Sequence, residues 1–189
     1  MTATPAPTSA APPDQPRATR IGPLVVAVAI GTAASVGLGV YGRLHTPTGQ
    51  AINIAGFSNG LAAKSALTTA AFILAVAQVI TGPALIGRIP LKGAWLGPAH
   101  RWCGRLAVLC TVPVAVHCLY ALGYQTFDAR VAAHSLMGCL FFGAFIAKML
   151  VLTRDDAPGW VLPVLGGLVF SILTGLWLSA AVWFFVNGG

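Results

Sequence analysis

Long apolar runs alternate with short polar segments along most of the chain, and this pattern predicts helices that cross a membrane. Each run has about twenty residues or more, enough for an α-helix to cross the hydrocarbon core of a bilayer. The expected spans cover residues 23–41, 61–86, 102–122, 131–152 and 161–186. We therefore predict an all-α fold, an integral membrane bundle of five transmembrane helices.

The first twenty residues differ from the rest because they are rich in Pro, Ala and Thr and cannot bury enough apolar surface to fold. We expect a disordered cytoplasmic tail over 1–20 and a five-helix transmembrane domain over 21–189. A signal peptide is the competing interpretation of the first apolar run, but the Pro-rich tail and the four further spans favour a retained helix. In that run Gly31, Ser35 and Gly39 place a small residue at every fourth position, which lets a neighbouring helix approach closely.

The composition supports membrane insertion and excludes a soluble domain. Apolar residues make up 57% of the chain, charged residues only 8%, and the mean hydropathy is +0.82. A soluble domain needs more charge to cover its surface. The net charge of +7 does not indicate a nucleic-acid partner, because Lys and Arg are scattered at the ends of apolar runs. The expected partner is the lipid bilayer.

The distribution of Lys and Arg predicts the orientation. Five spans put the termini on opposite faces of the membrane. The N-terminal face would hold Arg17, Arg20, Arg88, Lys92, Arg101, Arg105, Lys148 and Arg154, and the other face Arg43, Lys64 and Arg130. Because Lys and Arg are enriched in cytoplasmic loops, the excess predicts a cytoplasmic N-terminus in a multi-pass protein of the plasma membrane.

The four cysteines carry no metal or haem-attachment motif. They are Cys103, Cys110, Cys118 and Cys139, and none is spaced as CxxC or CxxCH. This spacing argues against covalently attached haem, a zinc site and a disulfide framework. Their places within or at the ends of apolar helices indicate buried small hydrophobes.

Two histidines, His117 and His134, are the main candidates for metal ligation and cofactor binding. They flank the short polar turn 123–130, and their midpoint, (117 + 134)/2 = 125.5, falls inside it. Residues equidistant from the turn of an antiparallel hairpin lie at equal depth, so the two imidazoles are placed to hold a haem between them. A structural polar pair and a proton relay are the alternatives. Ionisable residues inside a membrane are functional candidates by default.

His45 and His100 are the further cofactor-binding candidates. His45 lies in the linker beside Pro47, on the face of the matched pair, where it would replace a ligand or act as an outer gate. His100 opens the cluster HRWCGR on the opposite face. That cluster could contact a haem propionate or an anionic lipid head, and an ordinary positive-inside anchor is the favoured alternative. A second bis-histidine haem is not expected, because no other histidine lies at the depth of His100.

One polar residue, Gln78, lies deep in the second span. It would face a quinone or cofactor, or bond a neighbouring helix, and the hydrogen bond between helices is the favoured interpretation.

The arrangement of these residues resembles a known class of membrane protein. His100, Arg101, Trp102, two further residues and Arg105 open a span that has His117 near its end and is followed by His134. This pattern resembles membrane b-type cytochromes of the cytochrome b561 and ferric-reductase kind, over residues 61–186. The whole chain, with RLHTPTG at 43–49, also resembles uncharacterised five-helix actinobacterial membrane proteins.

The resemblance implies haem b, electron transfer, and quinone, ascorbate or ferric iron as redox partners. The sequence departs from the two-haem members, which need four ligands in two pairs, commonly on helices two apart. Here the matched pair His117 and His134 lies on consecutive spans, so one haem b is expected.

The function that we predict is therefore a membrane-embedded haem b protein, an oxidoreductase or electron-transfer subunit. One haem near the outer face cannot carry electrons across a hydrocarbon core of about 30 Å. The chain would therefore act as the anchor of a quinol-linked complex with a partner redox subunit. Ser135 or Tyr120 would hydrogen-bond a ligand histidine. The alternative is a membrane scaffold or assembly subunit without haem. A transporter is disfavoured because the spans lack Asp and Glu.

Overall fold

The computed structural model describes residues 21–50 and 59–187, and this part of the chain is helical without strands. The elements in chain order are α1 (Ile21–Leu44), α2 (Gly60–Leu85), α3 (Leu96–His117), η1 (Cys118–Leu122), α4 (Ala129–Leu152), α5 (Val161–Leu176), η2 (Trp177–Val182) and α6 (Trp183–Val186). The π-helices η1 and η2 continue α3 and α5, so the chain has five helices long and apolar enough to cross a membrane. The predicted fold class is confirmed, whereas the predicted tail over 1–20 lies outside the described residues.

The helix boundaries follow from capping side chains and glycines. Asn59 and Asp128 precede α2 and α4, and each side chain accepts a 2.8 Å hydrogen bond from the backbone N–H three residues later. Such caps satisfy an N–H that has no partner within the helix. Gly123 ends η1 with φ of 70°, a conformation that disfavours residues with a side chain. The polar turn between α3 and α4 is thereby shortened to residues 123–128.

The predicted start of the third helix is wrong. The helix begins at Leu96, six residues before the expected start at 102, and it includes His100. Pro98 falls in the first turn, where a residue without an N–H breaks no hydrogen bond, so it does not delay the helix. His100 is consequently part of the helical bundle and not of the connecting segment.

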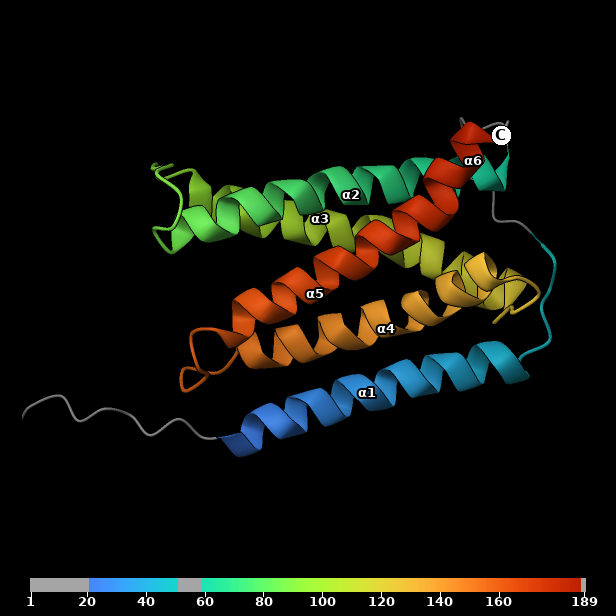
Figure 1. The fold of residues 1–189 in the computed structure, drawn as a ribbon, viewed down its shortest axis with the longest axis horizontal. Helices are drawn as coiled ribbons and strands as arrows, with labels where there is room; N and C mark the ends of the chain where they lie inside the picture. Colours follow the sequence, from blue (N-terminus) through green and yellow to red (C-terminus); the bar gives the residue numbers. More distant parts are fainter. Residues whose placement is uncertain (1–20, 51–58, 188–189) are drawn as a thin grey trace, which may run out of the picture.

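The helices form two groups that α5 joins (Figure 1). α2 packs against α3, while α4 packs against both α1 and α5. α5 crosses diagonally, so that its continuation η2 packs against α2. α3 and α4 follow each other in sequence but do not pack closely along their lengths. α1 begins at the end of the bundle opposite to the end where α6 finishes, as five spans require.

Small residues bring α1 against α4. A Cβ atom added at Gly31 would collide with the carbonyl oxygen of Gly143, and one added at Gly143 would collide with Ser35 Oγ. The predicted close approach at the small residues of the first span is confirmed. The outer face of α1 stays exposed, as expected of a helix that faces lipid.

Aromatic rings fasten the fifth span to α2. The ring of Trp177 stacks on the ring of Phe72, with centroids 4.2 Å apart. The ring centroid of Phe170 lies 6.0 Å from that of Phe72. The indole N–H of Trp177 donates a 3.1 Å hydrogen bond to Thr69 Oγ1. These contacts lie in the middle part of the fifth span, and they hold it across the bundle.

Candidate functional site

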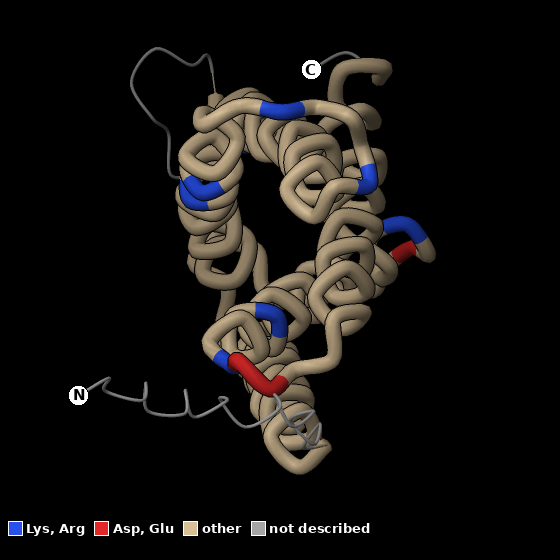
Figure 2. The backbone as a smooth tube through the Cα atoms, turned by 90° about the vertical axis from the view of Figure 1, so that its left-hand side faces the viewer, with Lys and Arg blue, Asp and Glu red and all other residues tan. Residues whose placement is uncertain are grey.

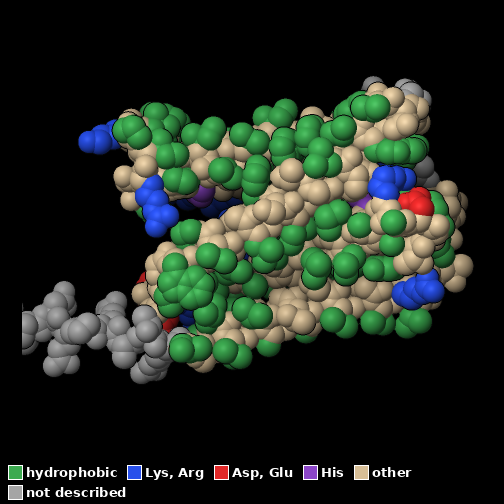
Figure 3. Space-filling view, viewed as in Figure 1, with side chains coloured by type: hydrophobic (Ala, Val, Ile, Leu, Met, Phe, Trp, Pro, Cys, Tyr) green, Lys and Arg blue, Asp and Glu red, His purple; other side chains and the backbone are tan. Residues whose placement is uncertain are grey.

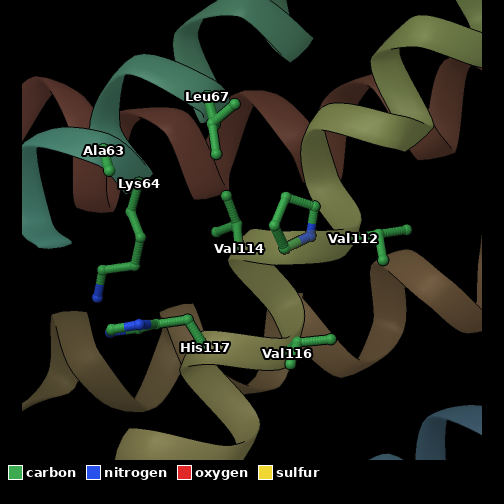
Figure 4. Close-up of a pocket in the computed structure, with 8 residues that line it drawn as sticks. Ala63, Lys64, Leu67, Val112, Val114, Val116 and His117 are labelled. Carbon is green, nitrogen blue, oxygen red and sulfur yellow. The ribbon is translucent and has the colours of Figure 1, made fainter. Parts of the chain in front are cut away.

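His117 is the last residue of α3 and is only 4% exposed. Its imidazole lines a cavity of about 200 Å³, and the side chains of His117 and Lys64 point toward one another there (Figure 4). The remaining lining residues are apolar: Ala63, Leu67, Val112, Pro113, Val114 and Val116. An imidazole and an ammonium therefore share an otherwise apolar space between α2 and α3.

His134, in the second turn of α4, is oriented by a serine from the fifth span. Its Nδ1 atom lies 2.9 Å from Ser179 Oγ, and Ser179 Oγ donates its own hydrogen to the carbonyl of Gly175 at 2.7 Å. Because the hydroxyl has one hydrogen, Nδ1 of His134 must donate to it. The proton is thus on Nδ1, and Nε2 keeps a lone pair, the form in which imidazole binds iron.

The two histidines lie at the same end of the bundle. His117 is five residues before the last residue of η1 (122 − 117 = 5), and His134 is five residues after the first residue of α4 (134 − 129 = 5). Lys64, which lines the cavity of His117, lies at this end as well. His117 is on α3 and His134 is on α4. These two helices do not pack closely, so they are separated from each other.

Arg130 holds the start of α4 to the fifth span at this end. Its guanidinium donates a 2.7 Å hydrogen bond to the carbonyl of Ser179 and lies 4.2 Å from the ring centroid of Trp183. It also lies 4.0 Å from Asp128 in a half-exposed ion pair. Arg130 and His134 therefore both contact Ser179, and this fixes η2 relative to the histidine.

The structure places His45 at the same end, among tyrosines. Its ring stacks between Tyr41 and Tyr120, with centroid distances of 5.0 and 5.1 Å. Its Nε2 atom donates a 3.2 Å hydrogen bond to the carbonyl of Tyr120. This hydrogen bond leaves the lone pair on Nδ1 of His45, and its role as an alternative ligand stays a prediction.

His100 lies at the opposite end and is bonded to α2. Its Nδ1 atom is 2.8 Å from Thr81 Oγ1, and the amide of Gln78 donates to the backbone carbonyl of His100. The predicted hydrogen bond between helices at Gln78 is confirmed. The structure does not bring His100 to His117 or His134, because it separates them by most of the length of the bundle.

The sequence reasoning missed Ser179 and named the wrong serine as a partner of a ligand histidine. Ser135 Oγ donates to the carbonyl of Gln125 at 3.0 Å and accepts from its N–H at 3.2 Å, so it closes the turn before α4. Tyr120 stacks on His45. A hydroxyl near the end of the last apolar span was the available signal for Ser179.

The donor set fits a haem better than a bare metal ion. Within the described ranges no group of three or more His, Cys, Asp or Glu residues gathers, and all four cysteines are unpaired. Protein sites for zinc use three or four such ligands, whereas a haem iron needs only two axial ones. His134 Nε2 carries a lone pair, and His117 supplies a second imidazole at the same end of the bundle.

Fold and site together define a multi-pass helical membrane protein with a histidine on each of two consecutive spans. Residues 24–189 match the family model described as a family of unknown function, DUF6529, and the chain belongs to that family. No curated protein and no solved structure matches the sequence.

Proposed function

We propose that the protein is a haem b electron-transfer protein of the plasma membrane, with His117 and His134 as axial ligands. The observation that carries the proposal is the hydrogen bond from His134 Nδ1 to Ser179, which leaves Nε2 able to bind iron. A buried imidazole on α3 lies at the same end, on a helix that does not pack closely against α4. The cytoplasmic N-terminus expected from the charge distribution would put this end at the outer face.

The surrounding side chains have distinct tasks in this proposal. Ser179 holds the ring of His134 in one tautomer and one orientation. The ammonium of Lys64 and the guanidinium of Arg130 would balance the carboxylates of haem propionates, and the apolar lining of the His117 cavity would exclude water. When bound, haem b supplies an iron that carries one electron at a time.

The position of the pair near one end limits what the chain does alone. The hydrocarbon core is about 30 Å thick, and one haem near its edge cannot pass electrons across it. We therefore propose that the protein is the anchor of a complex, with a quinone and a partner redox subunit as its exchange partners.

Visible spectroscopy of the purified protein tests this proposal. We expect a reducible haem b spectrum from the full chain, lost in His117→Ala and in His134→Ala because each variant removes one axial ligand. His45→Ala is the matched control, since its ring is held by tyrosines at the same end, and it should keep the spectrum.

A folded but colourless wild-type preparation, grown with sufficient haem, would contradict the proposal. It would favour a membrane scaffold or assembly subunit, in which both histidines serve helix contacts.

A further inference from the structure

A second pair of polar side chains faces the interior at the end of the bundle opposite to His134. His100 is four residues after Leu96, where α3 begins (100 − 96 = 4), and Lys148 is four residues before Leu152, where α4 ends (152 − 148 = 4). Both lie about 6 Å inside their helix ends, at about 1.5 Å per residue. The two residues therefore lie at the same depth at this end of the bundle.

This end of the protein is hollowed. Figure 3 shows a hollow between the α2–α3 pair and α5, with His and Lys or Arg side chains inside it. The hollow arises because the fifth span contacts α2 from near its middle onward, where Phe170 and Trp177 lie against Phe72. Nearer its beginning, α5 lies beside α4 and leaves the last turns of α2 uncovered (Figure 1).

No carboxylate of residues 21–50 and 59–187 lies within ion-pair distance of Lys148. Among the described residues the ion pair is Arg130 with Asp128, at the other end of the bundle. Holding an ammonium in a half-buried, largely apolar setting without a carboxylate costs free energy. An anion entering the hollow would remove that cost.

Other charges at this end also favour an anion. Figure 2 looks onto this end and shows Lys and Arg positions on several helices and connections there. Among the described residues the basic ones at this end are Arg88, Lys92, Arg101, Arg105, Lys148 and Arg154, and the acidic ones are Asp155 and Asp156. The excess of four positive charges (6 − 2 = 4) attracts anions from the membrane surface.

His100 adds a neutral acceptor to this positive site. Thr81 Oγ1 donates its hydrogen to the carbonyl of Ala77 at 2.7 Å, so it accepts from Nδ1 of His100 at 2.8 Å. Nε2 of His100 is then unprotonated and accepts a hydrogen bond. The hollow thus offers a charged donor, Lys148, together with a neutral acceptor, His100.

We propose that Lys148 and His100 form a binding site for a phosphate group that also carries a hydroxyl. The phosphate oxygens would accept from the ammonium of Lys148, and the hydroxyl would donate to Nε2 of His100. The headgroup of phosphatidylglycerol and the hydrogen phosphate ion share this chemistry. The site is separate from the proposed haem ligands and does not depend on them.

Thermal unfolding of the full chain in neutral detergent tests the site. Phosphatidylglycerol should raise the unfolding temperature more than phosphatidylcholine, which has a phosphate but no headgroup hydroxyl, because a ligand bound by the folded state stabilises it. Lys148→Gln should need about tenfold more phosphatidylglycerol for the same rise, since it loses a charge-assisted hydrogen bond. Arg43→Gln removes the same charge from an exposed position at the other end and should respond as wild type does.

Three further measurements make the result decisive. Thr81→Val should also weaken the response, because it removes the acceptor that fixes the tautomer of His100 while leaving Lys148 in place. Native mass spectrometry of the wild type should show retained phosphatidylglycerol. If sodium phosphate alone gives a Lys148-dependent rise equal to that of the lipid, the ligand is free phosphate. Equal responses of Lys148→Gln and wild type, or equal effects of the two lipids, would overturn the proposal.

Discussion

Ser179→Ala is the sharpest test of how His134 is prepared for iron. In the wild type, Ser179 Oγ accepts from His134 Nδ1 at 2.9 Å and donates to the carbonyl of Gly175 at 2.7 Å. Alanine removes the hydroxyl and leaves the helix intact, because Gly175 is already part of the α5 backbone ladder. The imidazole would then be free to rotate and to carry its proton on either nitrogen.

The expected loss can be estimated from this single contact. A neutral hydrogen bond contributes about 0.5–1.5 kcal/mol, equivalent to about a twofold to tenfold change in affinity. Freedom of the tautomer adds to this loss, and removing a partner that orients a metal-bound histidine typically weakens the metal site by about 10- to 100-fold. We expect haem affinity to fall about tenfold in Ser179→Ala. The midpoint potential should become more positive, because an imidazole without this partner is less basic and stabilises ferric iron less.

Haem titration of the detergent-solubilised apoprotein, followed by a redox titration of the loaded protein, measures both effects. Ser135→Ala is the matched control, because Ser135 lies next to His134 in sequence but bonds Gln125. It should leave the affinity and the potential unchanged. Ser179→Thr keeps a hydroxyl and should restore most of the affinity.

The reasoning fails if Ser179→Ala binds haem as the wild type does, with the same potential. That result would mean that His134 does not bind iron through the nitrogen left available by Ser179.

Two further predictions concern the packing of the bundle. Gly143→Ala should lower the thermal unfolding temperature in detergent, because its Cβ would collide with Ser35 and Gly31, and overpacking of this kind costs about 1–3 kcal/mol. Gly166→Ala, on a helix face with nothing within 4 Å of the added atom, is the control, and an equal loss in both variants would contradict the close approach of α1 to α4. Trp177→Phe should reduce the free energy of unfolding by about 1 kcal/mol, since it keeps the stacking on Phe72 but loses the 3.1 Å hydrogen bond to Thr69. Chemical denaturation of Trp177→Phe, Thr69→Val and the double variant measures this free energy of unfolding. If the losses of the two single variants add up in the double variant, the hydrogen bond is not the cause.

Much of the fold follows from local pattern. Apolar runs of sufficient length specify the five spans, and the small residues around Gly31 specify a close helix contact. Gln78 as a lone polar residue indicated the hydrogen bond between helices that the structure contains. The start of α3 was placed too late because Gly97 and Pro98 are typical of loops, although a proline is equally suited to the first turn of a helix.

The hydrogen bonds that orient His134 and His100 could not be predicted from the sequence. Ser179 and His134 are 45 residues apart, and their contact depends on where the fifth span crosses the bundle. Stacking of Trp177 on Phe72 sets that crossing, and nothing in the periodicity of either helix specifies its partner. The bond between Thr81 and His100 was missed for another reason: His100 had been placed outside the helix, where its ring would not face α2.

The two π-helices let a span contain an extra residue without changing the direction of the side chains that follow. η1 directly follows His117, and η2 contains Ser179. A π-helical turn takes up one residue more than an α-helical turn, so it absorbs an inserted residue without displacing what lies beyond. Deleting a single residue from Trp177–Val182 would therefore restore α-helical winding while leaving the side chains beyond the π-helix in place. Trp183 would stay over Arg130, and the last turn of the fifth span would keep its angular alignment with α4.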